Sequence, residues 1–148
     1  MIKNKLLHEN SLDRFLVAQE DCYEDVLQEL RQGRKKTHWI WFIFPQLRGL
    51  GHSEYSQYYG FGSEDSVRGY WDDPVLGGRY RECLEILLAS NRSLESILGE
   101  LDAKKLQSSL TLFDYAVPNS PLLKNALNQL FGGAKDWVTI DILVRPIS

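Results

Sequence analysis

Apolar residues recur every three or four positions through most of this sequence, and this spacing places them on one face of a helix. The first stripe spans residues 12–30, where Asn10 or Ser11 can serve as the N-cap. The second spans residues 74–88 and follows Asp73, a typical N-cap, with proline at the first helical position. A chain with such stripes must bury them against one another, which predicts a set of packed helices.

Three further helices are predicted in the C-terminal half. One stripe covers residues 106–113, follows Asp102 and ends before Pro118, and another covers residues 122–130 after Ser120 and a proline. The last stripe covers residues 137–143 and follows Asp136 as its cap. Its valine, threonine and isoleucine favour a strand, but the apolar spacing indicates a helix.

A short apolar run at residues 39–44 cannot be assigned by periodicity. Pro45 pushes the preceding residue out of the α region, so a helix in this run must end at Phe44. We expect one or two buried helical turns here, because the sequence offers no second strong strand for pairing.

No low-complexity linker and no internal repeat divides the 148 residues. The sequence therefore predicts an all-α, compact single domain over residues 1–148, with about six to seven helices and a flexible N-terminus over residues 1–10. A chain of this length can bury roughly two thirds of its unfolded surface, so it needs no metal or disulfide to fold. It has no signal peptide and no run of about 18 apolar residues, so we expect a cytoplasmic protein without a membrane partner.

The formal net charge is −3 and the isoelectric point is about 5.6, which argues against a protein built mainly to hold nucleic acid phosphates. A basic run at Arg31, Arg34, Lys35 and Lys36 nevertheless lies beside aromatic residues, a combination that single-strand binders use. Cations are also favourable at a helix C-terminus, so an RNA- or DNA-binding module ranks third among the functions considered.

The stretch from Thr37 to Gly51 combines aromatic rings with few polar groups and two glycines. These rings serve either as core or as a stacking platform for a planar ligand such as a nucleobase. Ser53 can cap a short helix beside Arg48, and a helix start next to a guanidinium favours an anion. The alternative is a tight turn in which Ser53 only caps and Arg48 pairs with an acidic neighbour. The predicted ligand-binding residues are Trp41, Gln46, Arg48, Gly49, Gly51, Ser53 and Tyr55.

Four strings carry a resemblance to a known family: GRKKTHWIWFIFPQLRGLGHS, DDPVLGGRYREC, LQSSLTLF and FGGAKDW. Together they resemble the domain of unknown function 1810 family, a group of small bacterial proteins. The similarity runs from Phe15 to Leu143, which is nearly the whole chain. The resemblance implies a compact all-helical domain and brings no established activity.

The leading hypothesis is a domain that binds an anionic small molecule, such as a nucleotide derivative, in a pocket around residues 38–59. An enzymatic version would use His38 as general acid or base to hydrolyse an N-glycosidic or phosphate bond. The alternative is a protein-interaction module with no small-molecule site, whose partner the sequence does not identify. The chain contains neither a Walker loop nor metal-ligand spacing, so we expect no metal and no cofactor. Ser108 or Ser109 can point inward toward neighbouring groups or a ligand.

Overall fold

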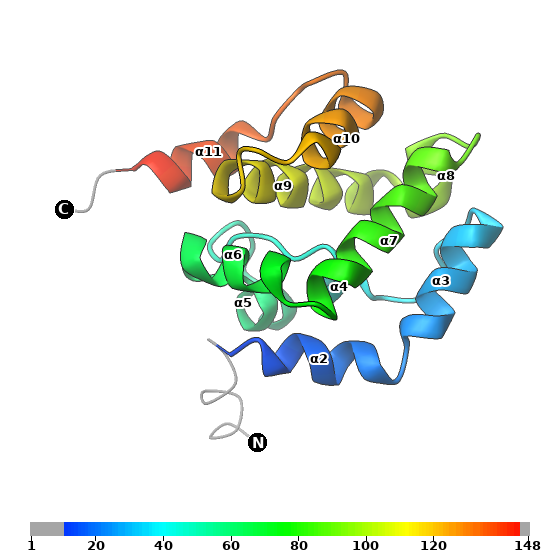
Figure 1. Ribbon diagram of the computed structural model, residues 1–148, viewed down its shortest axis with the longest axis horizontal. Coiled ribbons are helices and arrows are strands. Elements are labelled where there is room, and N and C mark those ends of the chain that lie inside the picture. Colours follow the sequence, from blue (N-terminus) through cyan, green and yellow to red (C-terminus); the bar gives the residue numbers. More distant parts are fainter. Residues whose placement is uncertain (1–10, 146–148) are drawn as a thin grey trace.

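The structure is a computed structural model that describes residues 11–145 (Figure 1). The predicted flexible N-terminus, residues 1–10, lies outside this range. Within residues 11–145 the regular elements are helices, and no strand is present. The helices are α2 (Asp13–Glu20), α3 (Tyr23–Gln32), α4 (Ile40–Ile43), α5 (Glu54–Tyr59), α6 (Glu64–Asp72), α7 (Leu76–Ala89), α8 (Leu94–Leu98), α9 (Glu100–Ala116), α10 (Pro121–Phe131) and α11 (Trp137–Val144).

The all-α class is confirmed, but the expected number of about six to seven helices is wrong, because residues 11–145 contain ten. The stripe over residues 12–30 does not form one helix; it breaks at Asp21 and Cys22 into α2 and α3. The short helices α6 and α8 were not expected. Each starts at a serine N-cap, Ser63 or Ser93, whose hydroxyl accepts a hydrogen bond from the amide three residues on.

Several predicted helix ends are confirmed at the level of individual caps. α10 lies between the Ser120 cap and Gly132, whose positive φ of 59° ends the helix in the left-handed region. α11 begins behind Asp136, so its strand-favouring residues are helical as the apolar spacing indicates. α7 begins at Leu76, slightly later than predicted, with the Asp73 carboxylate accepting hydrogen bonds from the first amides. The run 39–44 contains the single helical turn α4.

The long helix α9 lies at the centre and contacts α4, α6, α8, α10 and α11 (Figure 1). Its Phe113 is fully buried and stacks on Tyr80, with ring centroids 4.3 Å apart. Three more rings surround Phe113, with centroids 5.8, 5.7 and 6.0 Å away: Phe61, Tyr70 and Trp71. In the core, aromatic rings from the middle of the chain therefore pack around one residue of α9, Phe113.

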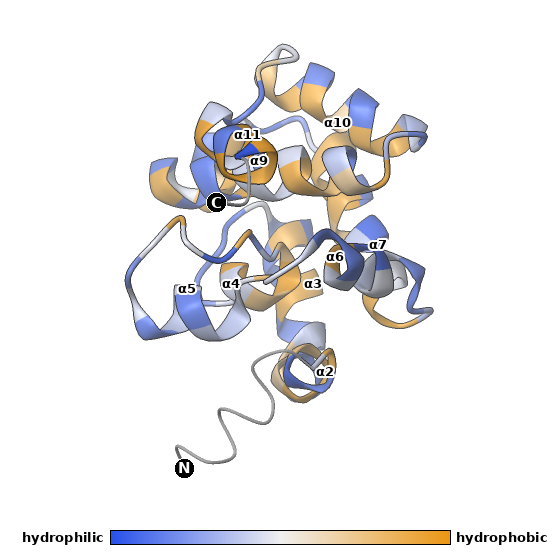
Figure 2. Cartoon of the chain, turned by 90° about the vertical axis from the view of Figure 1, so that its left-hand side faces the viewer, coloured by the Kyte–Doolittle hydropathy of each residue, from blue (hydrophilic) through white to orange (hydrophobic). Residues whose placement is uncertain are grey.

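The segment that carries α5 forms a closed loop on the outside of this core. Its two ends meet at an isolated parallel bridge between Leu47 and Phe61, and both of these residues are buried. Two backbone hydrogen bonds of 2.9 Å fix the bridge, from the Phe61 amide to the Gln46 carbonyl and from the Arg48 amide to the Phe61 carbonyl. Figure 2 shows α5 in the pale and blue shades of polar residues. None of the helices within residues 11–145 has both the length and the apolarity to cross a membrane.

Candidate functional site

A cavity of about 420 Å³ lies between the segment from α4 to α5, the first half of α9 and the start of α11. This volume falls within the range of about 300–1,000 Å³ that is typical of small-molecule sites. The cavity is lined by Trp41, Gln46, Leu47, Leu50, Gly51, His52, Ser53, Tyr55, Ser56, Tyr59 and Gly60 from the first segment, by Leu101, Lys104, Lys105 and Ser108 from α9, and by Asp136 and Val138.

Five predicted ligand-binding residues are among those that line the cavity: Trp41, Gln46, Gly51, Ser53 and Tyr55. Ser53 also caps α5 as expected, because its Oγ accepts a hydrogen bond of 3.1 Å from the Ser56 amide. The side-chain amide of Gln46 makes no hydrogen bond to any residue in the range 11–145. A half-buried amide without a protein partner can therefore bind polar groups of a molecule in the cavity.

Three other predicted site residues do not line the cavity. Gly49 has a φ of 104°, which identifies it as a turn residue. Arg48 donates through Nε to the Gln57 carbonyl at 3.2 Å and through Nη2 to the Gly60 carbonyl at 3.0 Å. Its guanidinium thus binds the end of α5 instead of facing the cavity. His38, the candidate general acid or base, is exposed on the loop before α4.

The cations that line the cavity are Lys104 and Lys105 on α9. The Lys105 Nζ lies 4.2 Å from the centroid of the Trp41 ring, a cation–π contact, and 3.2 Å from Asp102 Oδ1. Lys104 is exposed, and its ammonium has neither an ion pair nor a hydrogen bond with another described residue. The pair places positive charge at one side of the cavity, with Lys104 available to an anion.

Aromatic rings form the opposite part of the wall. Tyr55 is 58% exposed at the mouth, and its ring centroid lies 6.4 Å from that of Trp41. Tyr59 lies deeper, with its centroid 6.2 Å from Tyr55 and 5.4 Å from Phe42. Burial, with smaller contributions from nearby tyrosines, raises the pKa of the Tyr59 hydroxyl, so this phenol is neutral at physiological pH.

The polar end of the cavity is built around Asp136. Its Oδ2 accepts hydrogen bonds from the Thr139 amide at 3.2 Å and from Ser108 Oγ at 3.1 Å. Ser108 therefore does point toward a neighbouring group, as the sequence suggested, and that group caps α11. In residues 11–145, no three His, Cys, Asp or Glu side chains gather in a group that could hold a metal ion.

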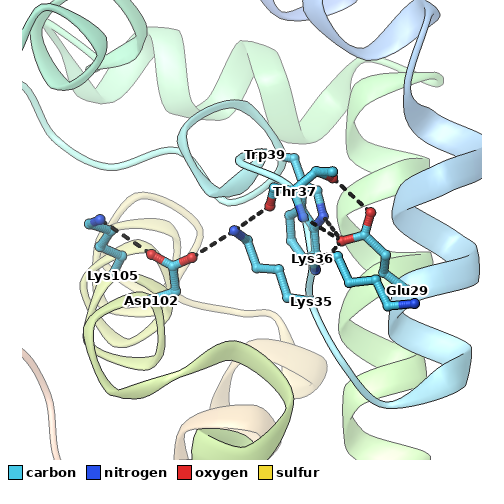
Figure 3. Close-up of polar contacts among 7 residues, drawn as sticks. All are labelled: Glu29, Lys35, Lys36, Thr37, Trp39, Asp102 and Lys105. Atoms are coloured by element: carbon cyan, nitrogen blue, oxygen red, sulfur yellow. Dashed lines mark hydrogen bonds and ion pairs between the residues drawn. The ribbon is translucent and has the colours of Figure 1, made fainter.

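Two carboxylates hold the loop that leads into α4 (Figure 3). Glu29 Oε1 accepts hydrogen bonds from the Lys36 and Thr37 amides at 2.6 and 3.0 Å and from the Trp39 indole N–H at 3.0 Å. Burial raises the pKa of Glu29, but these hydrogen bonds outweigh it and hold the pKa below its ordinary value. The second carboxylate is Asp102, which joins the loop to α9. The loop is thereby bound to α3 on one side and to α9 on the other. Because α4 follows it directly, the loop positions Trp41 in the cavity wall.

The basic run considered for nucleic acid binding does not form one free cationic surface. Lys35 Nζ lies 2.8 Å from Asp102 Oδ2, and the lysine side chain is only 7% exposed. Arg31, Arg34 and Lys36 are exposed. One of the four cations, Lys35, is therefore engaged in an ion pair inside the protein. Figure 3 shows this ion pair with Asp102, which links the loop to α9.

Sequence reasoning missed Lys104 and Lys105, although a signal for them exists. The two lysines share one face of α9 with Leu101 and Ser108, because they and Ser108 follow Leu101 by three, four and seven residues. The face is mixed in polarity, and it does not coincide with the apolar stripe that identified the helix. Only the fold reveals that it lies opposite Trp41.

Comparison with known proteins gives one family and one solved structure. The family model described as "Protein of unknown function (DUF1810)" matches residues 9–143. The crystal structure of the conserved hypothetical protein Rv1873 from Mycobacterium tuberculosis superposes with a TM-score of 0.87 at 40% sequence identity, covering 91% of this chain and 97% of that one. No curated protein gives a significant match.

Proposed function

Because the chain belongs to the DUF1810 family, whose description states no activity, we propose a function from the cavity itself: the protein binds a small anionic molecule that carries a planar ring. Nucleotide derivatives are the first class to test. The proposal rests on one observation: residues found from the sequence and residues found only from the structure line the same cavity. The aromatic and amide residues expected from the sequence line the same cavity as a pair of lysines from α9.

Each part of the cavity suits one part of such a ligand. Lys104 and Lys105 favour a phosphate or carboxylate, which lysine binds as a point charge. The exposed face of Tyr55 offers a platform for a ring, and such stacking is worth about 1–3 kcal/mol per base where it has been measured. The amide of Gln46 both donates and accepts, so it can bind the polar edge of a heterocycle.

The proposal is for binding, without a bond-breaking step. The position of His38 does not support a hydrolase that uses it, because the His38 side chain is exposed and is not part of the cavity wall. The imidazole that does line the cavity belongs to His52. A bacterial source and a cytoplasmic location stay predictions from the sequence.

The test is a thermal-shift screen against nucleoside monophosphates, dinucleotides, sugar phosphates and ADP-ribose, with Lys104→Ala and Gln46→Ala beside the wild type. A compound at 100 times its Kd adds about 2.7 kcal/mol of stability, which raises the melting temperature by about 5–11 °C for a chain of this size. We expect the free variants to melt like the wild type and the ligand-induced shift to fall.

Lys36→Ala is the matched control, because Lys36 is also an exposed lysine but lies outside the cavity. It should keep the full ligand-induced shift. A panel without any hit, or a hit that Lys104→Ala and Lys36→Ala reduce equally, would count against the proposal.

A protein-interaction function is the second candidate, and one observation favours it. The side chains of Trp137, Val138 and Val144 on α11 are 71%, 59% and 55% exposed, which leaves an apolar helix face open. Light scattering of the purified protein over a range of concentrations tests this reading in its simplest form. Self-association that Trp137→Ser abolishes would favour it over the ligand hypothesis.

A further inference from the structure

Helix α5 contributes three residues to the cavity wall, Tyr55, Ser56 and Tyr59, yet none of its own six residues is fully buried. It lies within the closed loop whose base is the Leu47–Phe61 bridge. A compact surface loop of this kind, with fixed ends and little buried apolar area, has the properties of a segment that opens without unfolding the core.

Two arginines bind the C-terminal end of α5. Arg14 on α2 donates through Nε to the Tyr58 carbonyl at 2.8 Å and through Nη2 to the Gly60 carbonyl at 3.3 Å. Arg48 binds the Gln57 and Gly60 carbonyls at 3.2 and 3.0 Å. These carbonyls carry the negative end of the helix dipole, so two guanidinium groups there are favourably placed.

Gly60 is the point where both arginines converge, and it leaves no space for a side chain. A Cβ there would lie 2.6 Å from the Ser56 carbonyl oxygen and 2.7 Å from the Cα of Arg48. The end of α5 therefore fits against the Arg48 backbone only because position 60 is glycine.

We propose that Arg14 and Arg48 are positioning residues that hold α5 as an adjustable wall of the cavity; this rests on the proposed binding function. Arg48 does not line the cavity, and Arg14 is 3% exposed and also lies outside it, so both act on a ligand through α5. Tyr55 and Ser53 reach their places in the wall only while α5 is docked. A ligand that needs this docked state binds more weakly in proportion to the fraction of molecules that lack it.

Hydrogen–deuterium exchange tests the docking without any ligand. In Arg48→Ala, Arg14→Lys and Gly60→Ala we expect the amides of α5 to exchange about tenfold faster or more, with α9 and α10 unchanged. Gly60→Ala retains both arginines and displaces the helix end by a different route. Arg68→Ala is the control, because Arg68 forms exposed ion pairs within α6. Unchanged α5 exchange in Arg48→Ala and Gly60→Ala, or a rise that α9 shares, overturns the proposal.

The second measurement is the affinity for adenosine monophosphate by calorimetry. The variant with the fastest α5 exchange should show the largest increase in Kd, about threefold or more, at an unchanged melting temperature of the core. Faster exchange with an unchanged Kd would refute the positioning role. If neither adenosine monophosphate nor any compound of the thermal-shift panel binds the wild type, the result counts against the proposed function. The exchange data alone then decide how α5 is held.

Discussion

The sharpest prediction concerns Glu29, the carboxylate that fixes the loop before α4. Its Oε1 accepts three hydrogen bonds, from the Lys36 and Thr37 amides and the Trp39 indole. A hydrogen bond to a charged acceptor is worth about 1.5–3 kcal/mol and a neutral one about 1 kcal/mol. Glu29→Gln keeps an oxygen in place but removes the charge, so each bond should weaken by about 0.5 kcal/mol or more. Because the neutral amide also costs less to bury, we expect a net loss of about 1–2 kcal/mol at pH 7.

Glu29→Ala should cost more, about 3 kcal/mol, because the indole N–H of Trp39 then loses its acceptor in the core. Trp39 is 1% exposed, so in the folded protein its indole N–H depends on the carboxylate as its acceptor. Urea denaturation followed by circular dichroism measures both losses, and the melting temperature should fall by about 2–4 °C for each kcal/mol. Glu85→Gln, an exposed site on α7, is the control and should change stability by less than about 0.5 kcal/mol.

The pH dependence of this effect has a definite sign. The folded pKa of Glu29 lies below its ordinary value, so the contribution of the carboxylate is complete above an unfolded pKa of about 4.3. It is lost as the pH falls through the folded value. The stability difference between wild type and Glu29→Gln should therefore be largest near neutral pH and shrink in acid. Equal stability at pH 7, or a difference that grows as the pH falls, would refute the reasoning.

Two further substitutions test the core. Gly77→Ala should destabilise the protein by about 2–3 kcal/mol, because a Cβ there would lie 2.0 Å from the Trp71 carbonyl oxygen and must push α7 away from α6; a thermal melt within 1 °C of the wild type would contradict this. Tyr80→Phe should cost about 1–3 kcal/mol in urea denaturation, because Ser109 Oγ, 3.0 Å from the Tyr80 hydroxyl, is left in the core without that partner. Adding Ser109→Ala should recover part of the loss in unfolding free energy. A double variant that loses more than the sum of the two single losses would argue against the pairing.

The helix ends that were predicted correctly are set by local chemistry. Ser120, Gly132 and Asp136 act through their own side chain or backbone on neighbouring amides and carbonyls, so their effect is visible in a few residues. The break at Asp21 and Cys22 has no such signal. The apolar stripe continues through it, and the direction of the chain there depends on packing against elements that come later.

The candidate site shows the same division between local and distant information. The aromatic residues near Trp41 were found because they are close together in the sequence. Lys104 and Lys105 were missed because their place opposite Trp41 depends on how α9 crosses the molecule. The role of Arg48 at the end of α5 could not be derived either, because the groups it binds there are backbone carbonyls, which are the same for every residue type.

The position of Phe113 has a consequence for how the chain folds during synthesis. Phe61, Tyr70, Trp71 and Tyr80 all leave the ribosome before Phe113, the ring on which they converge. Until α9 follows, these rings have no central partner and remain exposed to other chains and to chaperones. We therefore expect folding to be completed late, after most of the polypeptide is made, in a single cooperative step.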